Sequence, residues 1–474
     1  MKKFYDRERE MEQLRDMQQQ AYEDYSRFVV LTGRRRVGKT SLVYRLMEET
    51  KEEAPGLYFF VGRKTEATLV RTFCEEVRTR LEEYVPEGIS TFRGLLQLLL
   101  EIGKRRRFTL FIDEFQEFDN VNAGVFSDVQ ELWDKYKKET KVCLIVSGSD
   151  GEDIDYRRPP SRLGRADASI ALHSLLRRFK DEEQPLFGRD DCTIKLQPFT
   201  TKTMREILGD YKADYTNEDL LALWTITGGV ARYIEQLMNN RCTNVKKMLH
   251  YVCGSGDSYF IEEGKSVLVQ EFGKQYGTYF SILDQIAHGD VTQSDIEAAL
   301  GVKSLGGQLK VLEEKYGIIR KKRPVGAKEG SQTVRYEIQD NFFRFWFRYI
   351  HRYSSLIEIQ NLPALEQIMA DDYPTFSGIA LERWFRQKMM ESLRYKIIGG
   401  WWQAGGGVNA KGNSDEFEID IVAETLEGEV EAYEVKRNPK KYNSARLREK
   451  VGMMQRHLYR GQEVKMAGLS MEEM

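Results

Sequence analysis

The sequence predicts an α/β protein of several domains, the first of which is built on a parallel β-sheet. The chain has 474 residues, about three times the length of a typical domain, so we expect roughly two to four folding units. Over the first 200 residues, short apolar runs alternate with helical patterns, which is typical of a parallel sheet covered by helices on both faces. The first apolar run leads through a glycine-containing turn into a helical pattern, which indicates a strand–loop–helix unit.

The composition is that of a globular protein without a dominant charge. There are 72 Lys and Arg residues against 74 Asp and Glu residues, so any surface that binds nucleic acid must be a local patch. Hydrophobic residues make up 41% of the chain, which excludes general disorder. The 5 cysteines form no CxxC pair, so we expect neither disulfides nor a structural zinc site. Because no long apolar stretch or signal-peptide pattern occurs, we expect a cytoplasmic protein without a membrane partner.

The first predicted domain, residues 1–199, alternates strands and helices. Its strands are expected at residues 28–32, 57–61, 108–112, 142–146 and 193–196, with helices at residues 69–81 and 92–102. Continuous apolar runs of this length indicate strands that are buried on both faces. Residues 150–168 are polar, contain Pro159-Pro160 and lack apolar periodicity, which predicts an insertion outside the core.

Two helical regions and a linker follow the first domain. Residues 200–264 are helical and are interrupted by a glycine pair, as expected of a small lid domain. Residues 265–345 predict a winged helix-turn-helix, because three short helices precede two short strands. These elements are expected at residues 279–286, 292–300 and 303–315 for the helices and at residues 318–319 and 333–338 for the strands. Residues 346–374 predict an aromatic helical linker whose rings pack in a core or between domains.

The last predicted domain, residues 375–474, returns to an α/β pattern. A helix at residues 379–393 is followed by a strand at residues 396–398. Two further strands and a final helix are expected at residues 417–423, 430–435 and 445–458. Alternating polar and apolar residues in the two later strands indicate a sheet with two different faces.

The turn after the first strand matches the phosphate-binding pattern GxxxxGK[ST], and it lies between a strand and a helix as that pattern requires. Glycines let backbone N–H groups wrap phosphates, Lys39 reaches the β and γ phosphates, and Thr40 offers a hydroxyl to Mg²⁺. The sequence therefore predicts ATP and Mg²⁺ as cofactors. The predicted nucleotide-binding residues of this turn are Gly33, Arg34, Arg35, Arg36, Val37, Gly38, Lys39, Thr40 and Ser41.

Two carboxylates follow the buried strand at residues 108–112. Asp113 is predicted to join Thr40 in holding the Mg²⁺ and to contribute to the nucleotide site. Glu114 is predicted to orient and activate the attacking water as a catalytic residue. A plain turn would also accept two adjacent acids, but the phosphate-binding turn favours the catalytic interpretation.

The motifs together resemble the archaeal-type P-loop ATPases of the AAA+/STAND class. The resemblance is carried by the segment Phe4–Glu10, the turn GRRRVGKT, the strand FIDEFQ, the run VSGS that begins at Val146, and the segment PLFGR that ends at Arg189. The C-terminal half resembles the restriction-endonuclease-like domain that often ends such chains. The likeness covers nearly the whole chain, with residues 150–175 as the main departure.

This resemblance implies further roles. The segment Phe4–Glu10 would contact the adenine, and Ser147 or Ser149 would sense the γ-phosphate. Arg232, in the sequence GGVARY, would be the second sensor in the lid. Arg189 would be a catalytic arginine finger, which predicts a homo-oligomer if it acts in trans. A solvated surface arginine is the alternative for Arg189.

A basic loop follows the predicted recognition helix of the winged helix. It contains one acid and six basic residues, which are Arg320, Lys321, Lys322, Arg323, Lys328 and Arg335. Such a loop suits the phosphates of DNA. The alternative is a winged helix that contacts protein or acts as a rigid spacer, because the helix carries few polar residues that could read bases.

The last domain carries the pattern of a PD-(D/E)xK site. On a strand, residues i and i+2 share a face, so Glu434 and Lys436 point together and antiparallel pairing could bring Asp420 beside them. The two carboxylates, completed by Glu382, are predicted to bind Mg²⁺, and Lys436 is predicted to position a water. A basic tract over residues 436–450 would suit a phosphodiester backbone. An edge strand in solvent, or a domain that has kept its shape without cleaving, remains the alternative.

Two functions fit these predictions. The first is an ATPase whose nucleotide state moves a DNA-binding winged helix and a nuclease-like domain. The second is a signalling or scaffold ATPase whose C-terminal domain binds protein and cleaves nothing. A metabolite kinase fits poorly, because the chain offers a lid, a wing and a nuclease-like domain instead of a compact acceptor pocket.

Overall fold

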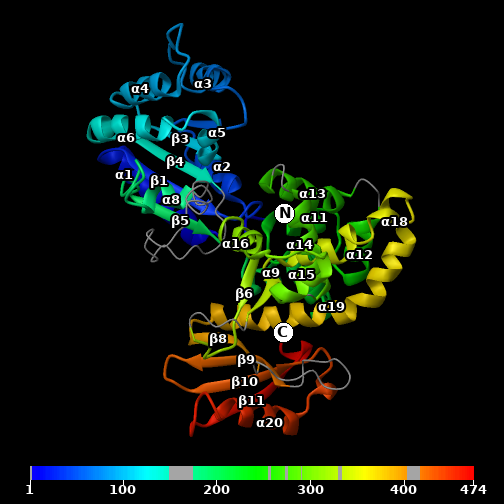
Figure 1. Cartoon of the computed structure of the whole chain (residues 1–474). Coiled ribbons are helices and arrows are strands. Elements are labelled where there is room, and N and C mark those ends of the chain that lie inside the picture. Colours follow the sequence, from blue (N-terminus) through cyan, green and yellow to red (C-terminus); the bar gives the residue numbers. More distant parts are fainter. Residues whose placement is uncertain are drawn as a thin grey trace. The chain divides into compact units, whose positions relative to one another are not determined.

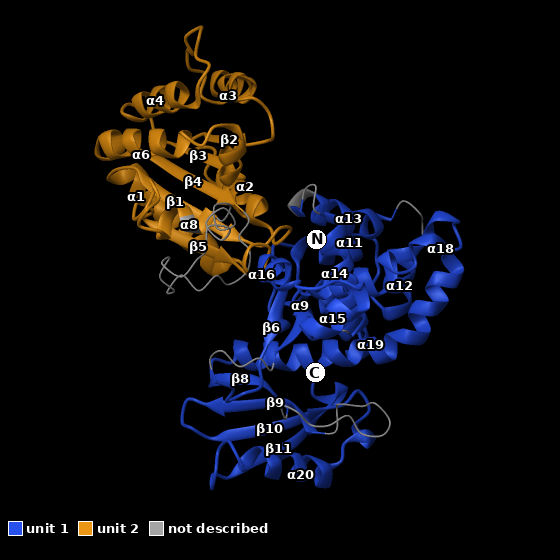
Figure 2. Ribbon diagram, viewed as in Figure 1, with its two compact units in different colours: residues 1–5, 199–313, 318–474 blue, residues 6–198, 314–317 orange. Residues whose placement is uncertain are grey.

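The computed structural model describes residues 3–148, 175–254, 258–272, 276–289, 291–328, 334–402 and 417–474. The chain folds into two compact units, which Figure 2 colours separately. Unit 2 comprises residues 6–198 and 314–317, and unit 1 comprises residues 1–5, 199–313 and 318–474. The finer division of unit 1 into lid, winged helix, linker and terminal domain stays a prediction. The predicted insertion at residues 150–168 lies outside the described residues.

Unit 2 contains the predicted parallel sheet. Its strands are β1 (Arg27–Gly33), β2 (Gly56–Phe60), β3 (Phe108–Asp113), β4 (Val142–Gly148) and β5 (Cys192–Leu196). They are ordered β2-β3-β4-β1-β5, and every neighbouring pair is parallel. The prediction of a parallel α/β sheet is therefore confirmed. Because the strands are parallel, the carboxyl ends of β1, β3 and β4 meet at one edge.

Helices cover both faces of this sheet (Figure 1). They are α1 (Glu8–Glu23), α2 (Lys39–Glu49), α3 (Glu66–Arg80), α4 (Phe92–Gly103), α5 (Phe118–Val121), α6 (Val125–Tyr136) and α8 (Leu175–Lys180). On β1, Val29 and Leu31 face α1 and α2, whereas Phe28 and Val30 face the cluster formed with α3, α4 and α6. This alternation explains why the strands read as continuous apolar runs in the sequence.

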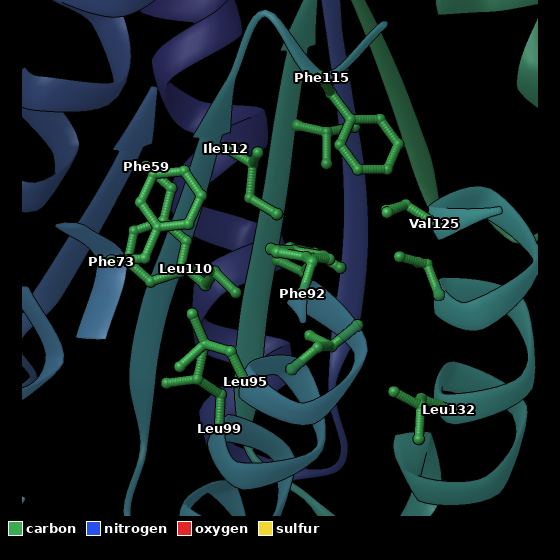
Figure 3. Close-up of a cluster of buried hydrophobic side chains, with 14 of the residues drawn as sticks. Phe59, Phe73, Phe92, Leu95, Leu99, Leu110, Ile112, Phe115, Val125 and Leu132 are labelled. Atoms are coloured by element: carbon green, nitrogen blue, oxygen red, sulfur yellow. The ribbon is translucent and has the colours of Figure 1, made fainter. Parts of the chain in front are cut away.

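The larger core cluster of unit 2 lies between the sheet and α3, α4 and α6. Figure 3 shows Phe92, Leu95 and Leu99 of α4 against Leu110 of β3. These α4 residues recur at intervals of three and four, so they share one face of the helix. Leu99 is buried at 1% exposure, whereas its neighbour Leu98 is only partly buried.

Unit 1 begins with helices and ends with a second sheet. The helices are α9 (Thr201–Tyr211), α10 (Asn217–Thr227), α11 (Ala231–Asn239), α12 (Val245–Cys253), α13 (Tyr259–Phe272), α14 (Tyr276–His288), α15 (Gln293–Leu300), α16 (Gly306–Glu314), α17 (Asn341–Phe345), α18 (Ser354–Glu358), α19 (Leu362–Glu391) and α20 (Ser444–Gln455). The strands are β6 (Ile319–Lys322), β7 (Arg335–Ile338), β8 (Tyr395–Trp402), β9 (Glu418–Thr425), β10 (Val430–Val435) and β11 (Val464–Leu469). None of the helices in the described ranges is long and apolar enough to cross a membrane.

Three helices, α14 to α16, precede an antiparallel hairpin of β6 and β7. The helix expected from residue 303 begins at Gly306 instead, because Ser304 adopts a left-handed φ of 67° that interrupts helical geometry. The aromatic segment after the hairpin is buried, as expected of core packing, and Trp346 donates to the carbonyl of Ile261 at 3.0 Å.

The second sheet is ordered β11-β10-β9-β8 and is mixed, because β10 and β11 are parallel while the other pairs are antiparallel. Helix α20 packs on it (Figure 1). Helix α19 has 30 residues and starts well before the predicted residue 379, so the boundary expected at residue 375 falls inside it. Strand β11 was not predicted, because it is an edge strand with no apolar alternation and its middle residues are exposed.

The burial of α4 generates a stability prediction. We expect Leu99→Ala to lower the free energy of unfolding of unit 2 by about 2–5 kcal/mol, because it leaves a cavity in a packed core. The matched control Leu98→Ala should cost about 1 kcal/mol, because less apolar surface is lost. Urea unfolding followed by circular dichroism measures both, and equal losses would contradict the packing described.

Candidate functional site

The phosphate-binding turn joins β1 to α2, and two glycines shape it. Gly33 ends β1 at a φ of 138°, and a Cβ there would lie 2.4 Å from the carbonyl oxygen of Leu196. Gly38 precedes α2 at a φ of 105°. Residues with side chains rarely adopt these angles, so the path of the turn depends on glycine. No side chain among the described residues caps the N-terminus of α2, which leaves N–H groups directed at the turn.

The side chain of Lys39 lies inside this turn. Its ammonium donates to the carbonyl oxygens of Gly33 at 2.7 Å and of Arg34 at 3.1 Å, and the residue is 7% exposed. The buried guanidinium of Arg7 stabilises the turn. Its Nη2 donates to the carbonyl of Val37 in the turn at 3.4 Å and to the carbonyl of Gln197 at 2.7 Å. Burial lowers the pKa of Arg7. Sequence reasoning assigned the segment around Arg7 to the adenine and missed this support.

Asp113 lies at the end of β3 and is surrounded by hydrogen-bond donors. Its Oδ2 accepts from Thr40 Oγ1 at 2.8 Å and from Tyr58 of β2 at 3.2 Å. Its Oδ1 accepts from Ser147 of β4 and from the backbone N–H of Glu114 at 3.1 Å. The structure therefore brings together Thr40, Asp113 and Ser147, which the sequence had singled out. Tyr58 was not predicted, because its position is visible only once β2 is placed beside β3.

Glu114 follows Asp113 in the left-handed conformation, with a φ of 55°. Its Oε2 accepts from Gln116 Nε2 at 2.5 Å. A non-glycine residue at positive φ is uncommon and is frequent at functional sites. The hydrogen bond and the backbone angle together hold the direction of the carboxylate.

These residues fit a magnesium nucleotide. The turn offers backbone N–H groups and an ammonium to phosphates, and the paired Thr40 hydroxyl and Asp113 carboxylate are oxygen ligands of the kind that Mg²⁺ prefers. The hydroxyl of Thr32, just before the turn, is buried and finds no hydrogen-bond partner in the described part of the chain. A polar ligand bound at the turn would give this hydroxyl a hydrogen-bond partner.

The remaining residues that the family resemblance singled out have neighbours within their own unit. Arg189 forms a two-pronged ion pair with Asp134 of α6, with Nη2 2.9 Å from Oδ2. Arg232, in the first turn of α11, pairs with Glu235 at 2.8 Å. Ser149 lies outside the described residues. The roles of Arg189 and Arg232 as finger and sensor stay predictions.

The basic loop of the hairpin is largely paired with acids. Lys321 lies 2.6 Å from Glu313, and Arg335 lies 2.7 Å from Glu418 of β9. Arg320 pairs with Glu337, and Lys322 lies 3.8 Å from Glu382. The hairpin also contacts the second sheet, where the N–H of residue 325 donates to the carbonyl of residue 400 at 2.9 Å. Arg323 and Lys328 are exposed.

The residues of the predicted carboxylate–lysine site lie near the start of β9 and at the end of β10. Asp420 Oδ2 accepts from the N–H of Val435 at 2.7 Å and lies 3.4 Å from Lys436 Nζ. The same ammonium lies 3.0 Å from Glu434 Oε1. The structure therefore brings Asp420, Glu434 and Lys436 together, as their strand positions predicted.

Two cationic side chains that were not assigned to this site also lie at its carboxylates. Lys450 of α20 is buried, and its Nζ lies 3.1 Å from both oxygens of Glu434. Lys450 was assigned to a basic tract that would suit a phosphodiester backbone, but it is buried instead, because α20 turns this residue toward the sheet. Arg386 pairs with Glu382 at 2.6 Å and donates to the carbonyl of Asp420 at 2.6 Å.

The pKa values of Asp420 and Glu434 shift in opposite directions. Burial and the nearby charge of Glu382 raise the pKa of Asp420 to about 6. Burial opposes ionisation of Glu434, but the ammonium groups of Lys436 and Lys450 outweigh it and lower the pKa. Among the residues whose positions are described, no group of three or more His, Cys, Asp or Glu side chains is arranged to hold a metal ion. The roles of Glu382, Asp420 and Glu434 as metal ligands stay predictions.

Comparison with known proteins identifies the first half of the chain. Residues 4–237 match the model of an ATPase domain predominantly from Archaea, and residues 346–448 match a family of archaeal and bacterial proteins of unknown function. An uncharacterized protein of Methanocaldococcus jannaschii is 27% identical over 429 residues, covering 89% of this chain and 84% of that protein. The chain therefore contains a P-loop ATPase domain.

Two solved structures are similar at low sequence identity. The Walker-type ATPase of Pyrococcus abyssi has 18% identity and a TM-score of 0.49, covering 73% of this chain and 96% of that chain. Cdc6p of Pyrobaculum aerophilum has 16% identity and a TM-score of 0.38, covering 76% of this chain and 96% of that chain.

The raised pKa of Asp420 generates a pH prediction. Between pH 4 and 6, the folded protein keeps a proton on Asp420 that the unfolded chain, with a pKa near 3.8, has released. Protonation of Asp420 therefore favours the folded state. This stabilisation is fully present below about pH 4 and is lost as the pH rises through about 6. As the pH rises from 4 to 6, we expect the free energy of unfolding of Asp420→Asn to increase by about 1–3 kcal/mol relative to that of the wild type.

Thermal unfolding of both proteins from pH 4 to 7 measures this difference. The control is Asp371→Asn, which removes one carboxylate from an exposed position of α19. A stability difference between Asp420→Asn and the wild type that is flat with pH would contradict the burial of the Asp420 carboxyl group.

Proposed function

We propose that the protein is a Mg²⁺-dependent ATPase in which Lys39 binds the terminal phosphates and Glu114 activates the attacking water. Thr40 and Asp113 would hold the metal. The observation that supports this proposal is the hydrogen bond between Thr40 and Asp113 beside a glycine-shaped turn. The metal would neutralise charge on the phosphates, and Lys39 would add a second positive charge.

Glu114 is the residue best placed to act on water. It directly follows Asp113, and Gln116 fixes one of its oxygens. A water held at the other carboxylate oxygen would be oriented for attack and would lose its proton to Glu114. Burial of Lys39 and Asp113 limits the access of bulk water to the neighbouring charges, which strengthens their interactions with a bound phosphate.

We further propose that unit 1 acts on DNA. The α14–α16 helices and the β6–β7 hairpin have the order of a winged helix, and Asp420, Glu434 and Lys436 have the strand positions of a PD-(D/E)xK site. Besides Arg323 and Lys328 on the hairpin, exposed cations available for phosphates flank that site. They are the exposed residues Lys440, Lys441, Arg446 and Arg448, which could neutralise a phosphodiester backbone.

A second candidate function is a signalling or scaffold ATPase whose C-terminal sheet cleaves nothing. One observation favours it. Both oxygens of Glu434 are already paired with the buried ammonium of Lys450, and a metal ion would have to compete with that charge. In this case the exposed cations of α20 would bind an acidic protein surface.

The ATPase proposal is tested by two substitutions at the turn and at the carboxylate. We expect Lys39→Ala to lose ATP binding and turnover, because it removes the ammonium that meets the phosphates. Glu114→Gln should keep ATP binding and lower kcat by about 10²–10⁴. Lys51→Ala, at an exposed lysine that pairs with Glu48, is the control and should leave both unchanged. Turnover in Lys39→Ala at the wild-type rate would contradict the site.

The DNA proposal is tested with duplex and single-stranded DNA at low salt. We expect DNA to raise ATP turnover, and we expect Lys436→Ala to abolish Mg²⁺-dependent DNA cleavage while leaving ATP turnover unchanged. The control Lys465→Ala removes an exposed lysine of β11 that pairs with Glu429 and should keep cleavage. A protein that neither binds DNA nor responds to it would support the scaffold function instead.

A further inference from the structure

We propose that Tyr58 is a positioning residue for the metal-binding carboxylate of Asp113. This inference rests on the proposed ATPase function. The phenol hydroxyl of Tyr58 lies 3.2 Å from Asp113 Oδ2. The side chain would hold the carboxylate in the direction that metal binding needs, without touching the nucleotide.

The strand register explains how Tyr58 reaches Asp113. Strands β2 and β3 are parallel, and Tyr58 pairs with Phe111, two residues before Asp113. Residues i and i+2 of a strand share a face, so Phe111 and Asp113 both point to the side on which Tyr58 lies. The carboxylate is about 6–7 Å further along β3, a distance that a long aromatic side chain leaning along the strand can bridge.

Asp113 is held from both neighbouring strands and from α2. Ser147 of β4 donates to Oδ1, whereas Thr40 of α2 and Tyr58 of β2 donate to Oδ2. The phosphate-binding pattern assigns the hydroxyl of Thr40 to the metal. When Thr40 binds the metal, Tyr58 remains as a side-chain donor to Asp113 Oδ2 among the residues that the structure describes.

Aromatic packing holds the hydroxyl in place. The ring of Tyr58 lies 5.5 Å from the ring of Phe111 and 5.1 Å from the ring of Tyr44 on α2. Two flanking rings leave the Tyr58 side chain little rotamer freedom, so the hydrogen bond to Asp113 needs little further ordering. A phenylalanine would fill the same space, so packing alone does not explain a hydroxyl at this position.

The role predicts a specific defect. Removing the hydroxyl should weaken the binding of ATP with Mg²⁺, because the carboxylate is less well directed. It should leave the binding of ATP without metal unchanged, because Lys39 and the backbone N–H groups of the turn are not altered. A merely structural role would weaken both.

The experiment compares Tyr58→Phe with Tyr44→Phe in the full chain. Both substitutions remove one phenol hydroxyl from the same ring pair, but Tyr44 is 47% exposed and serves as the matched control. ATP binding is measured during a Mg²⁺ titration and again in EDTA. We expect Tyr58→Phe to raise the Mg²⁺ concentration for half-maximal effect by about five- to tenfold, with EDTA affinity unchanged, and we expect Tyr44→Phe to match the wild type.

Two results would overturn the inference while leaving the proposed ATPase intact. One is a Mg²⁺ requirement of Tyr58→Phe equal to that of the wild type, and the other is an equal loss of ATP affinity with and without Mg²⁺. If the wild type itself bound ATP without any dependence on Mg²⁺, the proposed metal site and this inference would both fail. Thermal unfolding midpoints of both variants close to that of the wild type show that the comparison is made between folded proteins.

Discussion

The hydrogen bonds that converge on the carboxylate of Asp113 are the interaction on which the ATPase unit depends. They connect the turn after β1 to β2, β3 and β4, because Thr40, Tyr58 and Ser147 all donate to this one side chain. Burying a carboxyl group costs free energy unless hydrogen-bond partners surround it. The parallel order of the strands makes this arrangement available, because their carboxyl ends lie at one edge of the sheet.

A second group of charges, most of them buried or half-buried, links the β6–β7 hairpin, α19 and β9 in unit 1. Glu337 of β7 pairs with Arg320 of β6 and with Arg383 of α19, and Arg386 of α19 pairs with Glu382 and donates to the backbone at Asp420. Burial opposes the ionisation of Glu337, but the surrounding cations outweigh it and lower its pKa. Such a network costs desolvation energy, and removing one partner would leave an uncompensated charge. Ion pairs and a hydrogen bond, in addition to apolar contacts, therefore link the hairpin, α19 and the carboxylate–lysine site.

Local sequence patterns predicted the strands of unit 2 within about two residues, because each strand is buried on both faces and reads as an apolar run. The same reasoning missed β11, whose edge position leaves its middle residues exposed. It also started α19 too late, because that helix has no single apolar stripe along its 30 residues. Hydrophobic periodicity reveals a helix or strand only where the same face of that helix or strand stays buried along its whole length.

The sequence by itself determined the phosphate-binding turn and the shared face of Glu434 and Lys436, since both follow from the spacing of residues along one turn or one strand. The approach of Asp420 to this pair depended on the antiparallel pairing of β9 with β10. Only the tertiary structure decided that Tyr58 reaches Asp113, that Lys450 is buried against Glu434, and that most cations of the hairpin loop are paired with acids. These contacts join residues whose elements are distant in the chain or are brought together by packing. Spacing fixes which residues share a face, but packing of one element against another decides which faces meet.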